Sequence, residues 1–192
     1  KSLAVRLLIL WQAYTTNRGT KSMLNILEKK YREVDISDYI TFISLRAWGK
    51  FKGANVGKPV TEMIYVHSKL MIVDDRIVLC GSQNINDRSM LGNRDSELGV
   101  KISCDEDNMQ ESVMAGKKFW VSKFAHEYRM ELFRTHWGID FDGSEDHLIK
   151  DPVDSFEFLK TTAANNTKIY IEVFEKIQYN IHHMRDVDYI TD

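Results

Sequence analysis

The side chains best suited to chemistry in this sequence lie in one short run near its middle. His67, Lys69 and Asp74 follow the spacing His-x-Lys-x4-Asp, and Ser82 and Asn84 follow them in the form Gly-Ser-x-Asn. A histidine can attack an electrophile or transfer a proton. An ammonium, a hydroxyl and an amide can all donate hydrogen bonds to an anion. The set therefore predicts chemistry on a phosphate group.

The elements around this run must hold these groups on one face. Residues 64–73 are rich in β-branched and aromatic side chains and predict a strand, while residues 77–80 predict a strand that returns after a turn at residues 74–76. Successive side chains of a strand point to opposite faces, so His67 and Lys69 share a face. Residues 98–102 predict a third strand.

Asp74 fits this geometry differently. It lies seven positions after His67, so a regular strand would point it to the opposite face, and it falls where the chain turns. The motif makes Asp74 a catalytic candidate, but its spacing favours a structural role in fixing the turn. Ser82 and Asn84 share a face if the strand geometry continues past Gly81.

The run continues as Asn-Ile-Asn-Asp-Arg-Ser and then as Arg-Asp-Ser-Glu, which ends at Glu97. Together these letters resemble the phospholipase D superfamily, and the eukaryotic phospholipases D in particular. Nearly the whole chain shares the resemblance, and residues 59–97 carry most of its specificity. It implies an α/β fold: a phospholipase D-like half-domain in which helices pack on a mixed sheet, with a helical C-terminal flank.

The resemblance also implies a mechanism and a role for each residue. In this family two motifs meet across a pseudo-twofold axis, one histidine attacks phosphorus, and the other protonates the leaving alcohol and then activates water or a primary alcohol. This chain resembles the second half, so His67 is expected to be the general acid/base, although the two roles could be reversed. Lys69, Ser82 and Asn84 would contact the phosphate, and Glu97 would orient His67. No metal or other cofactor is required for the chemical step.

Three functional hypotheses follow. The first is the C-terminal catalytic half of an enzyme that hydrolyses phosphatidylcholine to phosphatidic acid and choline, inactive without the half that carries the first motif. The second is a single-motif protein that forms its site by homodimerisation, as nucleases or cardiolipin hydrolases of the family do. The third is a non-catalytic interaction module. The sequence pattern after the motif and the near-neutral charge favour the first.

Composition and net charge indicate which classes of partner the chain could bind. The chain has 192 residues, 43% hydrophobic and 28% charged, and a formal net charge of −2. It lacks the basic field that dominates nucleic-acid binding, which argues against a nucleic-acid partner. Two small basic clusters, Lys29, Lys30 and Arg32 and then Lys50, Lys52 and Lys58, are interpreted as solvated surface and not as a lipid-headgroup patch.

The expected partners and location come mainly from the resemblance. It implies a phospholipid substrate at a membrane surface, the N-terminal catalytic half, small GTPases, and phosphoinositide activation of the full-length protein. Two cysteines do not suggest a disulfide framework, and Cys80 is expected to be buried in its strand. A cytoplasmic protein peripheral on membranes is therefore expected. The first residue, Lys1, is interpreted as the start of a piece cut from a longer polypeptide.

The remaining pattern predicts mostly helices. Residues 1–110 are expected to form the α/β part and residues 111–192 a mainly helical flank, without a clear interior boundary. Gly138 is the expected end of a long helix, Asp151 is the expected N-cap of another, and the remaining histidines form no metal site. The expected ranges are helices at 2–14, 20–31, 111–137 and 169–177, a strand or short helix at 39–45, and loops at 49–58 and 165–167.

Overall fold

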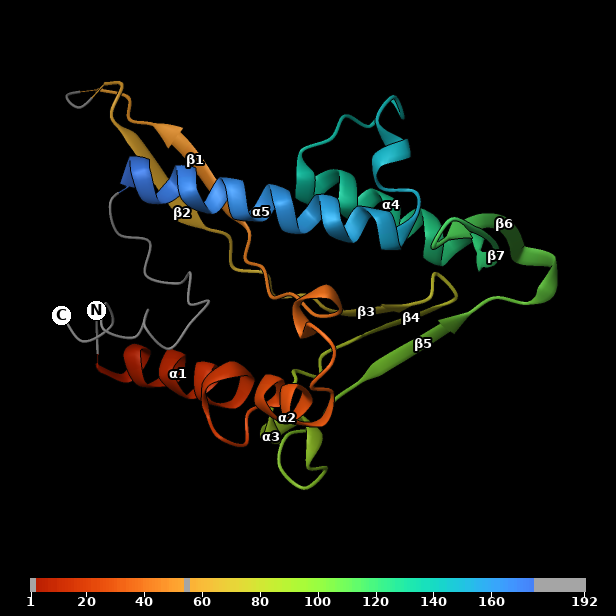
Figure 1. Ribbon diagram of the computed structural model, residues 1–192, viewed down its shortest axis with the longest axis horizontal. Coiled ribbons are helices and arrows are strands. Elements are labelled where there is room, and N and C mark those ends of the chain that lie inside the picture. Colours follow the sequence, from red (N-terminus) through yellow and green to blue (C-terminus); the bar gives the residue numbers. More distant parts are fainter. Residues whose placement is uncertain (1–2, 54–55, 175–192) are drawn as a thin grey trace. The chain divides into compact units, whose positions relative to one another are not determined.

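A computed structural model describes residues 3–53 and 56–174 of the chain (Figure 1). The fold class is α/β, as predicted, and the strands form small antiparallel sheets. The helices are α1 Leu3–Ala13, α2 Met23–Lys30, α3 Asp87–Met90, α4 Lys123–Trp137 and α5 Pro152–Phe174. The strands are β1 Arg46–Lys50, β2 Pro59–Met63, β3 Lys69–Val73, β4 Ile77–Gly81, β5 Gly99–Ser103, β6 Met109–Met114 and β7 Lys117–Ser122.

The described residues divide into two compact units. One comprises residues 45–47 and 62–164, and the other comprises the remainder. All the candidate site residues belong to the first of these units. The division expected at residue 110 falls inside β6 and not at this boundary. Strands β6 and β7 belong to the same unit as β3, β4 and β5.

The sheet that carries the motif has the order β3-β4-β5, with both pairs antiparallel. The predicted hairpin and third strand are therefore confirmed. The predicted strand at 64–73 is only partly right, because β3 begins at Lys69 and β2 ends at Met63. Lys69 already pairs with Gly81, the last residue of β4, so residues 65–68 extend beyond the end of β4 and have no partner there.

The turn between β3 and β4 has the expected position. The amide of Arg76 donates to the carbonyl of Val73 at 2.9 Å, and Asp74 and Asp75 both have a φ of 52°. Two central residues with positive φ are typical of type I′ turns, whose twist matches that of the strands they join. Asp is one of the few residue types with a side chain that tolerates this backbone conformation.

The helix predicted at 111–137 is wrong in its first half. Residues 109–122 form the β6–β7 hairpin, and Met114 pairs with Lys117 across a two-residue turn. Ala115 and Gly116 in that turn have φ values of 52° and 70°, which again suit a type I′ turn. Helix α4 starts only after Ser122, whose side chain accepts a hydrogen bond from the amide of Ala125. It ends as predicted at Gly138, which has a left-handed φ of 68°.

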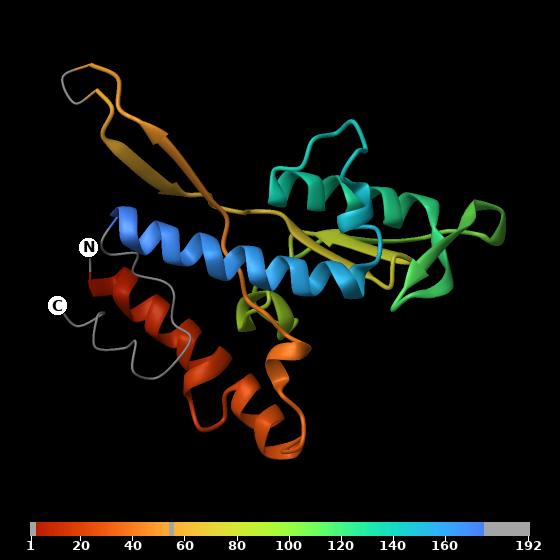
Figure 2. The same cartoon turned by 45° about the horizontal axis from the view of Figure 1, so that its top comes forward.

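The other helices show both confirmations and errors. Helices α1 and α2 lie within the helices predicted at 2–14 and 20–31. Asp151 caps α5 as predicted, since its carboxylate accepts from the amide of Val153 at 2.9 Å. Helix α5 then continues through 165–167, where a loop was expected, so the helix predicted at 169–177 is its last part (Figure 2). Residues 175–177 lie outside the described residues. Residues 39–45 form neither the strand nor the helix predicted there.

The core of the motif-bearing unit lies around α4. Met130, Ile139 and Ile149 are buried together, and Phe133, Trp137, Leu148 and Phe158 pack against them. On the sheet, Val78 is fully buried whereas Cys80 is exposed, so the predicted burial of Cys80 is wrong. Both face the same side of β4, so the contacts that cover this side end before Cys80.

Candidate active site

One end of the β3-β4-β5 sheet collects the polar groups of the motif. Lys69 at the start of β3 pairs with Gly81, and Gly81 pairs with Gly99 at the start of β5. The two glycines have no side chains, and a methyl group on Gly81 would lie only 2.7 Å from the carbonyl oxygen of Leu98. Lys69 is therefore the single side chain longer than hydrogen in this row of the sheet.

The Lys69 ammonium lies against the chain that leads into the strand. Its Nζ donates to the carbonyl oxygen of His67 at 2.5 Å. This contact links the backbone of the motif histidine to the lysine, although residues 65–68 are not part of a strand. The His67 side chain is exposed, and its ring stacks on Tyr65 with centroids 6.0 Å apart.

Ser82 connects the end of β4 with the start of β5. Its hydroxyl donates to the Glu97 carboxylate and accepts from the amide of Leu98 at 3.0 Å. The hydroxyl of Ser82 and then that of Ser89 hold the pKa of Glu97 below its ordinary value, and the charge of Lys69 acts in the same direction. Glu97 is thus an anion at neutral pH, placed within reach of the positive charge of Lys69.

The segment between Ser82 and Glu97 is fixed by its own polar side chains. Asn86 caps α3 by accepting from the amide of Ser89 at 3.1 Å, and the Ser89 hydroxyl accepts from the amide of Asn84 at 3.1 Å. Arg88 pairs with Asp95, with 2.8 Å between its Nε and the carboxylate. These contacts explain why the Asn-Asp-Arg-Ser letters accompany the motif: they shape the loop that holds the backbone of Asn84.

The structure brings Lys69, Ser82 and Glu97 together, and the backbones of His67 and Asn84 are bonded to the same group of residues. The hydrogen bonds of Glu97 go to serines, so its expected bond to His67 stays a prediction. Ser89 is a participant that the sequence reasoning missed. The signal for it was the spacing Asn86-x-x-Ser89, which is typical of an N-cap and its third helical residue.

Asp74 lies at the opposite end of the hairpin from Lys69. They are five positions apart in the sequence, which corresponds to about 17 Å at the rise of an antiparallel strand. The Asp74 carboxylate is therefore too far from the Lys69 ammonium to share one phosphate with it. This position agrees with the structural role favoured by its spacing and not with direct catalysis.

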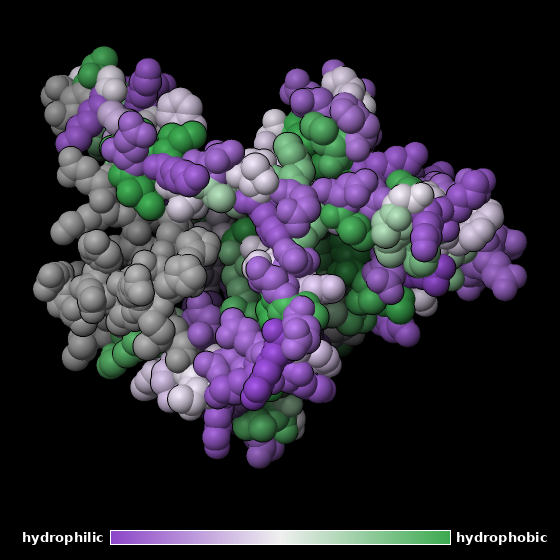
Figure 3. Space-filling view, in the orientation of Figure 1, coloured by the Kyte–Doolittle hydropathy of each residue, from purple (hydrophilic) through white to green (hydrophobic). Residues whose placement is uncertain are grey.

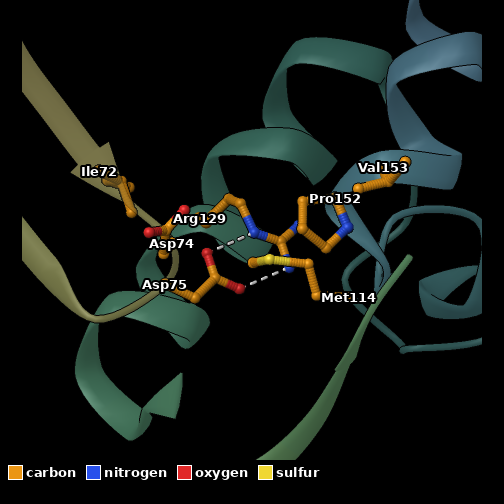
Figure 4. A pocket seen from close by; sticks show the side chains of 7 residues that line it. All are labelled: Ile72, Asp74, Asp75, Met114, Arg129, Pro152 and Val153. Carbon is orange, nitrogen blue, oxygen red and sulfur yellow. Dashed lines mark hydrogen bonds and ion pairs between the residues drawn. The ribbon is translucent and has the colours of Figure 1, made fainter. Parts of the chain in front are cut away.

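The neighbouring Asp75 anchors this turn to α4 (Figure 4). Its carboxylate lies 2.7 Å from Nε of Arg129 and 2.8 Å from Nδ1 of His126, and all three side chains are buried. Burial raises the pKa of Asp75, but the bonds from His126 and Arg129 outweigh this and hold it below its ordinary value. Arg129 also donates to the carbonyls of Ile149 and Lys150. His126, one of the histidines outside the motif, is thus part of a buried ionic network.

A small cavity of about 220 Å³ adjoins this network. It lies at the turn end of the hairpin and contains none of the groups that meet around Lys69, so we do not assign it to the motif chemistry. Its lining residues are Ile72, Asp74, Asp75, Met114, Arg129, Pro152 and Val153 (Figure 4).

Across residues 3–53 and 56–174, no group of three or more His, Cys, Asp or Glu side chains could hold a metal ion. Over the same ranges, no helix is both long and apolar enough to cross a membrane.

The end of an antiparallel sheet thus carries Lys69, Ser82 and Glu97 beside the His-x-Lys motif, the motif through which the sequence resembles the phospholipase D superfamily. The comparison with family models agrees, since the model described as "Phospholipase D" matches residues 2–185. The chain belongs to the phospholipase D family.

Named relatives support this membership. Phospholipase D B of Dictyostelium discoideum is 44% identical over 88% of this chain, and phospholipase D zeta 1 of Arabidopsis thaliana is 42% identical over 95%. Phospholipase D1 of Mus musculus is 43% identical over 90%. The chain spans only 14% of the first relative and 16% of the other two.

Proposed function

We propose that this chain supplies one of the two His-x-Lys motifs of a phospholipase D active site. The whole site would hydrolyse phosphatidylcholine to phosphatidic acid and choline through a phosphohistidine intermediate, and would transfer the phosphatidyl group to primary alcohols. The observation that carries the proposal is the meeting of Lys69, Ser82 and Glu97 at the sheet end where Gly81 and Gly99 carry no side chains.

Each residue has a role in this proposal. The histidine of the other motif attacks phosphorus, and His67 gives its proton to the departing choline oxygen. His67 then takes a proton from water, or from a primary alcohol, which attacks the phosphohistidine. The Lys69 ammonium and the Asn84 amide stabilise the charge that develops on the phosphoryl oxygens. Ser82 joins them if its hydroxyl exchanges Glu97 for the phosphate.

The surface around the motif supports completion by a second half. Tyr65, Ile85 and Leu98 are 81%, 92% and 80% exposed, and they stand next to or close to His67, Asn84 and Glu97 in the sequence. Large exposed apolar side chains are typical of a surface that a protein partner covers. We propose that the half with the first motif covers them in a cytoplasmic enzyme that is peripheral on membranes. Phosphoinositides and small GTPases would act on the full-length protein.

The test measures choline release from phosphatidylcholine vesicles, with and without a primary alcohol, together with mass in solution. We expect the 192-residue chain to be inactive and monomeric, and to gain activity when the half with the first motif is added. His67→Ala should abolish that activity, whereas His147→Ala, which removes an exposed histidine far along the chain, should leave it unchanged.

Two outcomes would refute the proposal. An active dimer of the 192-residue chain that His67→Ala inactivates would mean that two copies of this motif share one site. A complemented enzyme that keeps full activity with His67→Ala would mean that the motif is not catalytic and that the chain is an interaction module.

A further inference from the structure

The β1–β2 hairpin presents large apolar side chains to solvent. Trp48 on β1 is 67% exposed, Phe51 just after β1 is 48% exposed, and Val56 is 76% exposed. Three large apolar side chains exposed within nine residues of one hairpin give it an apolar surface suited to a partner.

The same hairpin is locally basic. Residues 48–61 contain Lys50, Lys52 and Lys58 and no aspartate or glutamate, although the whole chain has a net charge of −2. All three lysines are exposed. Within residues 3–53 and 56–174, no carboxylate forms an ion pair with any of them. Their positive charge is therefore available to an external anion.

Backbone hydrogen bonds hold these groups at the end of a long hairpin. The amide of Ile64 donates to Leu45 at one end, and the amide of Phe51 donates to Lys58 at the other. Both bonds fit one antiparallel register, in which Leu45 lies opposite Ile64 and Phe51 lies opposite Lys58. Phe51 and Lys58 therefore share one face of the hairpin, and Trp48 and Lys50 share the other. Aromatic and basic side chains thus alternate around both faces, and the hairpin carries hydrophobic and hydrophilic side chains side by side at the upper left of Figure 3.

We propose that the β1–β2 hairpin binds the surface of an anionic lipid bilayer, with Trp48 and Phe51 at the level of the headgroups and Lys50, Lys52 and Lys58 on lipid phosphates. The proposal rests on the proposed function, because a phospholipid substrate lies in a bilayer. It replaces the interpretation of these lysines as simply solvated, since the sequence alone did not reveal that the aromatic side chains between them are exposed.

The chemistry of the hairpin favours a bilayer over a protein or nucleic-acid partner. A tryptophan ring is amphipathic and prefers the boundary between headgroups and acyl chains. Lysines can extend their apolar stems along such a surface while their ammonium groups reach the phosphates. An acidic protein or a nucleic acid would need the lysines but would not require exposed Phe51 and Val56.

The test is flotation of the 192-residue chain with vesicles of phosphatidylcholine alone or with about a third of phosphatidylserine. Each lysine near an anionic surface contributes on the order of a fivefold gain in binding, so Lys50→Gln/Lys52→Gln/Lys58→Gln should weaken binding to anionic vesicles about a hundredfold. The control Lys29→Gln/Lys30→Gln/Arg32→Gln removes the same charge from the other basic cluster and should bind as the parent does.

The aromatic contribution is tested separately. Trp48→Ala/Phe51→Ala should weaken binding at least tenfold, whereas Tyr39→Ala, which removes an exposed aromatic ring outside the hairpin, should not. Circular dichroism checks that each variant is folded. In a background with Trp11→Phe, Trp120→Phe and Trp137→Phe, brominated acyl chains should quench the fluorescence of Trp48.

These results separate the inference from the proposed function. Binding that depends on both groups would support the inference even if no choline is released, because flotation does not require catalysis. Equal binding of the lysine variants and their control would overturn it. The inference would also be overturned if only the lysine variants lost binding and Trp48 were not quenched. That result would indicate attraction of the lysines to any acidic surface, without a contact between the aromatic side chains and the bilayer.

Discussion

The buried network at the β3–β4 turn offers a sharp comparison between two neighbouring aspartates. Asp74 and Asp75 share the same backbone conformation, with φ of 52°, but Asp74 is exposed and Asp75 is 3% exposed. Asparagine tolerates this conformation as aspartate does, so each can be replaced by asparagine with little backbone strain. The two substitutions therefore differ mainly in what the lost carboxylate was bonded to.

Asp75→Asn removes the negative charge that compensates buried Arg129. The new amide nitrogen would also face Arg129 or Nδ1 of His126, where Asp75 now offers oxygens at 2.7 to 2.8 Å. Breaking a buried ion pair on one side costs about 3–5 kcal/mol. Arg129 keeps its bonds to Ile149 and Lys150, so we expect a loss of about 3 kcal/mol in the free energy of unfolding, at the low end of this range. Asp74→Asn should change it by less than about 0.5 kcal/mol.

Urea unfolding at pH 7 measures both values. Fluorescence of Trp120 and Trp137 in a background with Trp11→Phe and Trp48→Phe reports on the unit that carries the network. With a urea slope of about 2 kcal/mol per molar, the midpoint of Asp75→Asn should fall by about 1.5 M. Equal midpoints for the two variants would refute the reasoning, since they would mean that the buried pair does not stabilise the hairpin.

The same network makes a prediction about acid. Because the folded-state pKa of Asp75 is lowered, its contribution is fully present above the ordinary carboxyl pKa and is lost as the pH falls through the lowered value. The parent chain should therefore lose stability below about pH 4, and the gap between parent and Asp75→Asn should narrow there. A gap that stays constant from pH 7 down to pH 3 would contradict the assignment.

Two further substitutions test how the site and the flank are held. Gly81→Ala would bring a methyl group to 2.8 Å from the Cα of Gly99, so we expect the free energy of unfolding to fall by about 1–3 kcal/mol and Ser82 to be displaced. Gly49→Ala, with open space around it, is the control and should show no clash. Urea unfolding measures the stability of each variant, and the titration of Glu97 by NMR reports the displacement of Ser82. Asp151→Asn would weaken three amide contacts, from Ala115, Gly116 and Val153, and should cost about 2 kcal/mol by the same unfolding assay, with Asp154→Asn as the exposed control.

Local pattern was sufficient for the hairpin and for the ends of helices. The strands at β3, β4 and β5 could be predicted because their apolar runs are short, β-branched and separated by turn residues. Gly138 and Asp151 could be assigned because each has a conformation or a capping bond that few residues supply. In each case the determinant lies within four residues of the feature.

The errors arose where local signals conflict. Residues 109–122 have apolar positions that fit helical spacing, but Ala115 and Gly116 adopt the positive φ of a hairpin turn, and Asp151 holds that turn from 35 residues away. The polar run at 165–167 predicted a loop, yet asparagine and threonine carry only a modest helix penalty, of the order of 0.7 kcal/mol each, and α5 continues through them. The hairpin thus depends on a contact that no short window contains, whereas the helix continues because its polar residues oppose it only weakly.

The site shows the same division. Lys69 and Ser82 were selected from the motif and its strand faces, and Glu97 from the family resemblance. The anchoring of the turn was not predicted, because Arg129 lies 54 residues after Asp75. The two observations together give the motif spacing a physical meaning. The four residues between Lys69 and Asp74 are the remainder of β3, so the spacing fixes the length of the strand between the phosphate end and the anchored turn. A shorter or longer strand would either detach Asp75 from α4 or move Lys69 away from Ser82, since a shift by one residue also turns every side chain to the other face. In the proposed function, the aspartate of the motif would act from about 17 Å away, as the first residue of the turn that ends the strand carrying Lys69.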